Sequence, residues 1–416
     1  MWSGNISNMC KCFLLAFCAV LLSPLEGFAQ TSDDLFNGNV LQEVRLYIHP
    51  HDWVNLRLHY LEDTYYAAEF HWIFNGRDIF TPQVAMRSRG LGSRSPIKPS
   101  LKIEFSRYES QYNFLGLQNL VLRGNTQDAS MMHERVGMEF LRRLGIPAPR
   151  EAHARLFVND AYEGLYTIVE QIDPLFLHNH LGENGGYLYN YTYADPFVFE
   201  YRGPDPATYS PSPFKPENHF IDPNPAPIEA MVRTINQASD SQFQAMVSQY
   251  VDLNGFVREI AAENFFSEQD GIIGDYGLNN FFLYRFQNSL VSTFLPWDKS
   301  NAFWAIDWPI LHNVHTDVLS KRALAIPSLL ALYSDTLRIA ADTAGGEGGW
   351  LEQEIMKEYR QIRQAAYEDG NKLCDPGASG LLRPCSNDQF DGEVGYMIQF
   401  AQQRAANVQA QLAAGQ

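Results

Sequence analysis

Short segments in which hydrophobic and polar residues alternate dominate the chain between residues 40 and 169. Alternation predicts β-strands, because successive side chains of a strand point to opposite faces. Asn75-Gly76 and Asn159-Asp160 have the composition of two-residue hairpin turns. Helical hydrophobic spacing instead predicts helices over 51–60 and 128–144. The predicted strands cover residues 40–48, 65–74, 79–87, 101–105, 155–158 and 164–169.

Helical spacing dominates from residue 228 onward. Helices are predicted over 228–250 and 253–268, and again within 319–412. Between them, residues 280–297 predict one further hairpin. Residues 191–227 are rich in Pro, Tyr and Asp, which predicts a long surface loop.

The order of elements, β-rich first and α-rich second, predicts an α+β fold with two lobes. We place the first lobe at about residues 40–190 and the second at 228–416. Ligand sites form preferentially where two such units meet, so we expect the functional site in a cleft between the lobes.

The first 29 residues have the order of a secretory signal. Lys11 precedes an apolar run over 12–22, and small residues lead to Ala29. The run is well short of the ~20 residues that span a bilayer. We therefore expect cleavage after Ala29 and an exported mature chain, residues 30–416, without a membrane span.

The charge balance bears on the class of partner. The 416 residues include 31 Lys and Arg against 48 Asp and Glu, a formal net charge of −17. Nucleic-acid binders need clustered cations to neutralise phosphates, so this balance argues against that class. With 45% hydrophobic and only 19% charged residues, the chain can bury a large core and is not disordered.

Export would remove three of the five cysteines and leave Cys374 and Cys385. In an oxidising compartment we expect this pair to form a disulfide that closes a short loop. Two free thiols or a partial metal site are the alternatives, although no CxxC spacing supports the metal.

A basic, glycine-rich segment, residues 87–95, connects two predicted strands. Arg89, Gly90 and Ser93 could form an anion cradle from a guanidinium, backbone N–H groups and a hydroxyl. Lys102, on the next strand, lies opposite its apolar neighbours and could reach a phosphate. On the pattern alone, a solvated basic turn is an equally good interpretation.

Carboxylate and amide side chains flank the predicted hairpin. Asp270 and Asp275 precede it, Asn280 opens its first arm, and Asp298 follows the second. Phosphoryl transfer needs such a set, because one carboxylate deprotonates a hydroxyl while an Asn and another carboxylate hold a metal ion. Without further information, turn and capping residues are the simpler interpretation.

Taken together and in this order, these segments resemble the CotH kinase family of spore-coat proteins. The resemblance runs from about residue 40 to the C-terminal helices. It implies an atypical, bilobal protein-kinase-like fold with a β-rich N-terminal lobe and a helical C-terminal lobe. The matching segments are residues 86–90, 98–105, 120–125, 144–150, 158–173, 185–189, 270–271, 279–284 and 296–298.

The resemblance implies transfer of the γ-phosphoryl group of ATP to Ser or Thr of exported or surface proteins, with Mg²⁺ or Mn²⁺. It assigns Asp270 as the catalytic residue, with Asp275 as the alternative. Asp298 and Asn280 would bind the metal ion.

The nucleotide-binding residues that the resemblance implies come from the first lobe: Arg89, Gly90, Ser93, Lys102 and Glu170. Glu170 would lie at the adenine-side connection between the lobes. Glu134, on the helix that follows the first strands, is expected to pair with Lys102.

The chain departs from the family pattern after Asp298. Family members usually carry a second acidic residue two positions later, but here Lys299 and Ser300 follow. Its loss could weaken metal binding, so the alternative is a catalytically silent surface or structural binding protein. A carbohydrate-active enzyme with paired carboxylates fits less well, because the acids accompany a phosphate-type loop rather than an aromatic groove.

Overall fold

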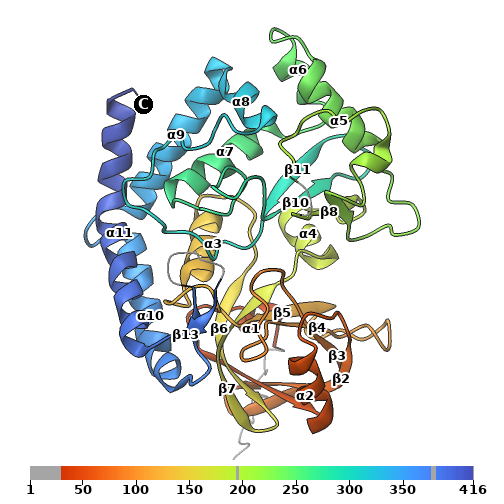
Figure 1. The fold of residues 1–416 in the computed structure, drawn as a ribbon, viewed down its shortest axis with the longest axis vertical. Coiled ribbons are helices and arrows are strands. Elements are labelled where there is room, and N and C mark those ends of the chain that lie inside the picture. Colours follow the sequence, from red (N-terminus) through yellow and green to blue (C-terminus); the bar gives the residue numbers. More distant parts are fainter. Residues whose placement is uncertain (1–29, 194–195, 376–380, 416) are drawn as a thin grey trace, which may run out of the picture.

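The computed structural model describes residues 30–193, 196–375 and 381–415. The expected secretory signal, residues 1–29, lies outside the described residues. Figure 1 shows two parts, a β-barrel below and a larger part of helices around a sheet above it. The α+β class is therefore confirmed, whereas a kinase-like pairing of two lobes stays a prediction.

Seven of the described strands close into a barrel in the first part. The parallel pairing of β1 with β6 closes the barrel, and its other neighbouring strands are antiparallel. Asn75-Gly76 and Asn159-Asp160 have positive φ angles, as tight hairpin turns require. Around the barrel the strands are β1 (Gln42–Ile48), β2 (Tyr66–Phe74), β3 (Arg77–Ser88), β4 (Leu101–Glu104), β5 (Asn119–Arg123), β7 (Ala161–Glu170) and β6 (Glu151–Val158).

The strand predictions are confirmed to within a few residues, but strand β5 was missed. Leu120 and Leu122 of β5 point into the barrel core, while Val121 packs in a second cluster with residues of the upper part. A strand buried on both faces shows no alternation, so this signal was absent from the sequence. The helices α1 (Ser32–Leu35) and α2 (Pro50–Leu58) add Leu35 and Trp53 to the barrel core.

The second part is built on a four-stranded sheet in the order β11-β10-β8-β9. Its strands are β8 (Tyr187–Tyr191), β9 (Phe214–Pro216), β10 (Phe281–Arg285) and β11 (Ser292–Pro296). Helices pack around the sheet, and the last two helices run along one side of the molecule as far as the barrel (Figure 1). They are α3 (His133–Arg143), α4 (Pro174–Leu181), α5 (Ala226–Gln237), α6 (Phe243–Val247), α7 (Leu253–Phe265), α8 (Val318–Leu324), α9 (Pro327–Ala344), α10 (Trp350–Glu368) and α11 (Asn387–Ala413).

Three expectations need correction. Strand β8 falls within the expected first lobe but pairs with β10 of the second sheet. The expected loop 191–227 contains the 3₁₀ helix η1 (Pro206–Thr208) and strand β9. The predicted helix 228–250 is wrong as one helix, because it breaks after Gln237 at a Ser-Asp-Ser segment whose polar side chains compete for backbone hydrogen bonds.

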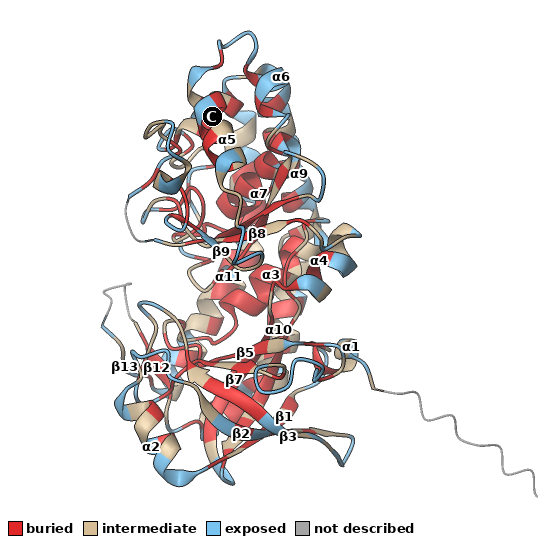
Figure 2. Ribbon diagram, turned by 90° about the vertical axis from the view of Figure 1, so that its right-hand side faces the viewer, coloured by how far each residue is buried: buried red, intermediate tan, exposed pale blue. Residues whose placement is uncertain are grey.

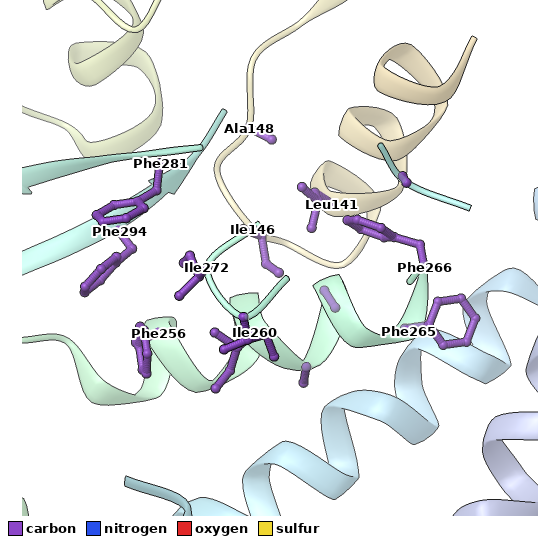
Figure 3. Close-up of a cluster of buried hydrophobic side chains, with 14 of the residues drawn as sticks. Leu141, Ile146, Ala148, Phe256, Ile260, Phe265, Phe266, Ile272, Phe281 and Phe294 are labelled. Carbon is purple, nitrogen blue, oxygen red and sulfur yellow. The ribbon is translucent and has the colours of Figure 1, made fainter. Parts of the chain in front are cut away.

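Helix α3 follows the barrel strands in sequence but packs in the second part. Figure 3 shows Leu141 of α3 and the nearby Ile146 in one cluster with Ile260 and Phe265 of α7. The helix begins at His133 rather than at the predicted Asp128, because the Asp128 carboxylate accepts a hydrogen bond from the His133 N–H. In Figure 2, α3 and α7 are among the most buried elements.

Helix α3 is also held by ion pairs to the two C-terminal helices. Arg135 pairs with Glu354 and Glu358 of α10, at 2.5 and 3.0 Å. His133 Nε2 lies 3.2 Å from Glu393 Oε1 of α11. Burial alone would lower the pKa of His133, but Asp128 and Glu393 raise it to about 9. His133 is therefore a cation at neutral pH.

A buried ion pair joins the barrel to the end of α10. Lys98 Nζ lies 2.5 Å from Asp369 Oδ2, and both side chains are fully buried. The Asp369 carboxylate also accepts hydrogen bonds from the N–H groups of Leu165 and Asn371. Because charge is costly to bury alone, this pair fixes the barrel against α10.

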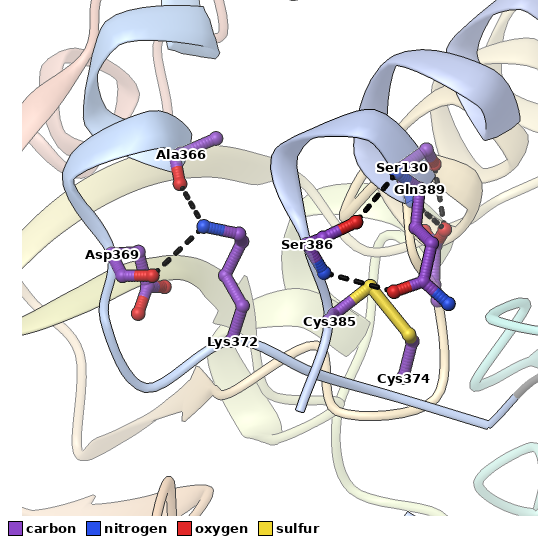
Figure 4. The surroundings of a disulfide bond; sticks show 9 residues. Ser130, Ala366, Asp369, Lys372, Cys374, Cys385, Ser386 and Gln389 are labelled. Atoms are coloured by element: carbon purple, nitrogen blue, oxygen red, sulfur yellow. Dashed lines mark hydrogen bonds between the residues drawn. A yellow bond between two sulfur atoms is a disulfide. The ribbon is translucent and has the colours of Figure 1, made fainter. Parts of the chain in front are cut away.

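The predicted disulfide between Cys374 and Cys385 is confirmed, with their Cα atoms 5.4 Å apart. Cys374 ends the short strand β12 (Leu373–Cys374), and Cys385 directly follows β13 (Arg383–Pro384), which pairs with β12 just before α11. Figure 4 shows Ser386 and Gln389 bonded to one another at the start of α11. The disulfide thus ties the beginning of α11 to the segment that follows α10.

By length and hydropathy, no single helix in the described part of the chain would cross a membrane. The bent pair of α8 and α9 meets the same test when the two are taken together, on length and composition only.

We predict that Lys98→Met lowers the free energy of unfolding by about 3–5 kcal/mol, because it leaves the Asp369 carboxylate buried and unpaired. Lys98→Met combined with Asp369→Asn should recover most of the loss, since asparagine still accepts hydrogen bonds without a charge. Urea denaturation of both variants measures the effect. A single variant as stable as wild type would contradict the role of this pair.

Candidate functional site

A cavity of about 780 Å³ lies beside the C-terminal helix α11. Its walls include Asp270, Ser300 and the α11 residue Glu393. A much narrower space lies nearer the barrel and is lined by Ser93, Arg123, Glu134 and Ser300, among others. The two spaces share Gln127, Asp128 and Ser300, so they adjoin one another.

Asp298 lies two residues after the end of β11 in a left-handed backbone conformation, with φ 48°. Its Oδ1 accepts hydrogen bonds from the Arg123 guanidinium at 2.5 Å and from the Ser300 hydroxyl at 2.8 Å. Burial alone would raise the pKa of Asp298, but the charge of Arg123 and these hydrogen bonds lower it to about 2. Asp298 is therefore an ionised carboxylate at any physiological pH.

Arg123, at the end of β5, bridges two carboxylates from different elements. Its Nε lies 2.6 Å from Glu134 Oε2 of α3, and its other side bonds Asp298. The expected pairing of Glu134 with Lys102 is wrong, because Lys102 Nζ lies 2.8 Å from Glu104 Oε1 on its own strand. Lys102 lies within β4, opposite Val121 of β5, and its side chain points outward from the barrel. Arg123, in contrast, is the last residue of β5 and lies next to α3.

Arg89 is a cation with no carboxylate within 4.0 Å in the described part of the chain. Its guanidinium lies 5.5 Å from the centroid of the Trp297 ring. Burial and the neighbouring charge of Arg123 lower its pKa to about 10, so it remains charged at neutral pH. By contrast, Arg87 and Arg94 in the same segment both pair with Asp63.

The segment after Arg89 bends toward Arg123. Gly90 has a φ of 113°, and a Cβ atom there would lie 2.9 Å from the Ser93 hydroxyl oxygen. Ser93 lines the narrow space, and its carbonyl accepts a hydrogen bond from the Thr126 hydroxyl. The structure therefore brings the predicted glycine-rich loop to the same space as Arg123 and Ser300.

Asp270 lines the larger cavity, and two amides hold its carboxylate. Asn279 Nδ2 donates to Oδ1 at 2.9 Å, and Asn280 Nδ2 donates to Oδ2 at 3.0 Å. Burial, with a smaller contribution from the charge of Asp298, raises the pKa of Asp270 to about 6 despite these hydrogen bonds. The structure thus brings Asp270 and Asn280 together. It also places Asp298 near enough for its charge to raise the pKa of Asp270.

Asp275, the alternative catalytic residue, has different surroundings. Its side chain is exposed, and Oδ1 lies 2.7 Å from Nε2 of His312. It does not line the cavity that contains Asp270.

Glu170 ends β7, directly before the connection to α4. Its buried carboxylate receives hydrogen bonds from the Arg150 guanidinium at 2.6 and 3.0 Å. Because the Glu170 side chain is already paired with Arg150, only the backbone of Glu170 could bind a ligand.

The residues present fit an oxygen-coordinated cation such as Mg²⁺ or Mn²⁺. Asp298 is ionised, and no described residue donates a hydrogen bond to Asn280 Oδ1. No group of three or more His, Cys, Asp or Glu side chains in the described residues could hold a metal ion. Further ligands would come from water and substrate phosphates, as is usual for Mg²⁺.

Sequence reasoning missed Arg123 and Ser300 as parts of this site. Arg123 belongs to the Leu-Val-Leu-Arg-Gly-Asn segment, which was noted only as a family landmark. A single arginine ending an apolar strand was the available signal. Its partners Glu134 and Asp298 are 11 and 175 residues away in sequence, so spacing could not identify them.

The chain is similar to several known proteins. Inner spore coat protein H of Bacillus subtilis (strain 168) is 24% identical over 354 residues, which cover 82% of this chain and 91% of that protein. Among solved structures, the Golgi casein kinase is 10% identical with a TM-score of 0.30, over 92% of this chain and 77% of the other. The Helicobacter pylori proinflammatory kinase CtkA is 10% identical with a TM-score of 0.24, over 74% and 95%.

Because both TM-scores are low, neither structural similarity establishes the fold of this chain. The model of the CotH kinase protein family, in contrast, matches residues 86–408. This range contains the glycine-rich loop, Arg123, Asp270 and Asp298. Because the match covers most of the chain, the protein belongs to the CotH kinase protein family.

Proposed function

We propose that the protein is an atypical, metal-dependent kinase that transfers the γ-phosphoryl group of ATP to Ser or Thr hydroxyls of exported or surface proteins. One observation carries the proposal. An ionised Asp298 is bonded to Arg123 and Ser300, which line a space adjoining the cavity of Asp270. Phosphoryl transfer requires anion-binding groups next to a carboxylate base.

Membership in the CotH kinase protein family supports this proposal. The barrel and the mixed second part would act as the two lobes of a kinase-like fold, with the site between them. The disulfide and the similarity to a protein named as a spore-coat component are compatible with an exported chain.

Arg89, Gly90 and Ser93 would hold the phosphates of ATP. Arg89 is charged and lacks a carboxylate partner among the described residues, so an anionic ligand would complete its surroundings. Gly90 keeps the backbone free of a side chain beside the Ser93 hydroxyl. Lys102 and the backbone of Glu170 stay predicted nucleotide contacts.

Asp298 and Asn280 would hold the metal ion through a carboxylate and an amide oxygen. When bound, Mg²⁺ or Mn²⁺ supplies positive charge against the phosphoryl group. Arg123 would keep Asp298 ionised and oriented, because it binds Oδ1 and leaves Oδ2 for a ligand.

Asp270 would orient the acceptor hydroxyl and accept its proton. Its pKa of about 6 keeps it ionised at neutral pH while leaving it more basic than an ordinary aspartate. Asn279 and Asn280 fix both of its oxygens, so the carboxylate is already oriented. The exposure of Asp275 and its pairing with His312 disfavour it as the base.

A catalytically silent binding protein is the second candidate. Ser300 stands where family members usually carry an acidic residue. Its hydroxyl donates a hydrogen bond to the same Asp298 oxygen, Oδ1, that Arg123 binds. The metal ion would then have fewer negative ligands than in an active relative.

We predict that Asp270→Asn lowers kcat for transfer of labelled phosphate from ATP by about 10²–10⁴-fold, because the acceptor loses its base. Asp275→Asn is the matched control from the same loop and should stay within about threefold of wild type. The reverse pattern would make Asp275 the base. A wild type that binds ATP but transfers nothing would support the silent candidate.

The pH dependence follows from the pKa of Asp270. The base works only when deprotonated, and its pKa is raised to about 6. The rate kcat/KM should therefore be level near pH 7–8 and fall about tenfold per pH unit well below pH 6. Initial rates between pH 4.5 and 8 measure this, with folding checked by circular dichroism. A rate that stays level down to pH 5 would exclude Asp270 as the titrating base.

We predict that Arg89→Ala weakens binding of ATP with Mn²⁺ by roughly tenfold or more, since a charge-assisted hydrogen bond is lost. Arg87→Ala is the matched control, because Arg87 lies two residues away and pairs with Asp63. Isothermal titration calorimetry compares the two. Equal affinities for both variants would remove Arg89 from the phosphate site.

A further inference from the structure

A buried ammonium group directly follows Asp298. Lys299 is fully buried, and its Nζ lies 2.6 Å from Glu263 Oε1 of α7. The same Nζ donates to the backbone carbonyl of Asn280 at 3.2 Å. One side chain therefore links the segment of Asp298 to α7 and to the start of β10.

Glu263, the partner of Lys299, also shapes the backbone beside Asp270. Its second oxygen accepts a hydrogen bond from the Ile272 N–H at 2.8 Å. A Cβ atom on Gly271 would lie 2.6 Å from the Glu263 carboxylate. The glycine of the Asp270-Gly271 pair is thus required because a buried carboxylate packs directly against it.

Asn280 completes the connection from the other side. Its amide donates to both the backbone carbonyl and the carboxylate of Asp270, at 2.9 and 3.0 Å. The backbone carbonyl of Asn280 accepts hydrogen bonds from Lys299 Nζ and from the Trp297 N–H. Asn280 and Asp298 both have left-handed backbones, with φ of 57° and 48°, a conformation that surrounding contacts must hold in place.

We propose that Lys299 is a positioning residue for phosphoryl transfer. Its ammonium group sets the spacing between Asp270, Asn280 and Asp298 by binding the Glu263 carboxylate and the Asn280 carbonyl at once. This inference rests on the proposed kinase function. It also explains why a cation occupies the core at this place, since an apolar residue would leave the buried Glu263 carboxylate without a positive charge beside it.

The test combines Lys299→Met with Glu263→Gln. The pair of substitutions removes both charges of this ion pair, and glutamine can still accept the Ile272 hydrogen bond. We expect kcat for phosphate transfer to fall about 10–100-fold, because small displacements of reacting groups have effects of that size. The KM for ATP should change less than about threefold, since Arg89 and the glycine-rich loop are untouched.

Ile362→Ala in α10 is the control for a purely structural effect. Ile362 is fully buried in the same core and has no polar group. This variant should lower Tm through a cavity while kcat stays within about threefold of wild type. Amide hydrogen exchange adds a readout without turnover. The Trp297 N–H, which donates to the Asn280 carbonyl that Lys299 also binds, should exchange faster in the double variant but not in the control.

Outcomes separate this inference from the proposed function. A wild type that transfers no phosphate overturns both. An active wild type together with a double variant of unchanged kcat overturns the role of Lys299 alone. If the double variant does not fold, Lys299→Gln combined with Glu263→Gln replaces it, because two amides can bond one another without charge, while the shorter side chain at 299 cannot also reach the Asn280 carbonyl. The same loss of kcat at unchanged KM is then expected, and a wild-type kcat refutes the inference.

Discussion

The guanidinium of Arg123 is the contact on which the arrangement of the site depends. It lies at the end of a barrel strand, yet it forms ion pairs with Glu134 of α3 and with Asp298 after β11. Glu134 is 11 residues from Arg123 in sequence, whereas Asp298 is 175 residues away. The charge of Arg123 also keeps Asp298 ionised, because it lowers the pKa of that carboxyl to about 2. The barrel thereby orients a carboxylate that belongs to the other part of the molecule.

The basic residues in and near the glycine-rich loop differ in their ion-pair partners. Arg87 and Arg94 bind Asp63, and Lys98 joins the barrel to α10 through Asp369. Lys102 pairs with Glu104 on its own strand. Arg89 is left without a carboxylate within 4.0 Å in the described ranges, and it lies close enough to Arg123 for that charge to lower its pKa. A cluster of positive charge in the sequence therefore corresponds mostly to ion pairs, and Arg89 is the member of this cluster without one among the described residues.

Much of the local structure could be predicted from sequence, because the barrel hairpins depend on neighbouring residues. Asn75-Gly76 and Asn159-Asp160 identify their turns through backbone preference alone. Closure of the barrel by β1 and β6 could not be predicted, since it depends on contacts between residues more than 100 positions apart. The same holds for the site. Asp270, Asn280 and Asp298 were identified as candidates by their residue types and family resemblance, whereas the partner of Glu134 required the fold.

Helix α3 has surroundings that restrict how the protein could be controlled. Arg135 is bound by two glutamates of α10, and His133 is bound by Glu393 of α11. The opposite side of the helix packs in the central hydrophobic core. An outward swing of α3 would separate several buried charges at once, each at a cost of several kcal/mol. Glu134 is therefore a fixed part of the frame, and regulation would have to act by admitting or blocking ligands rather than by moving this helix.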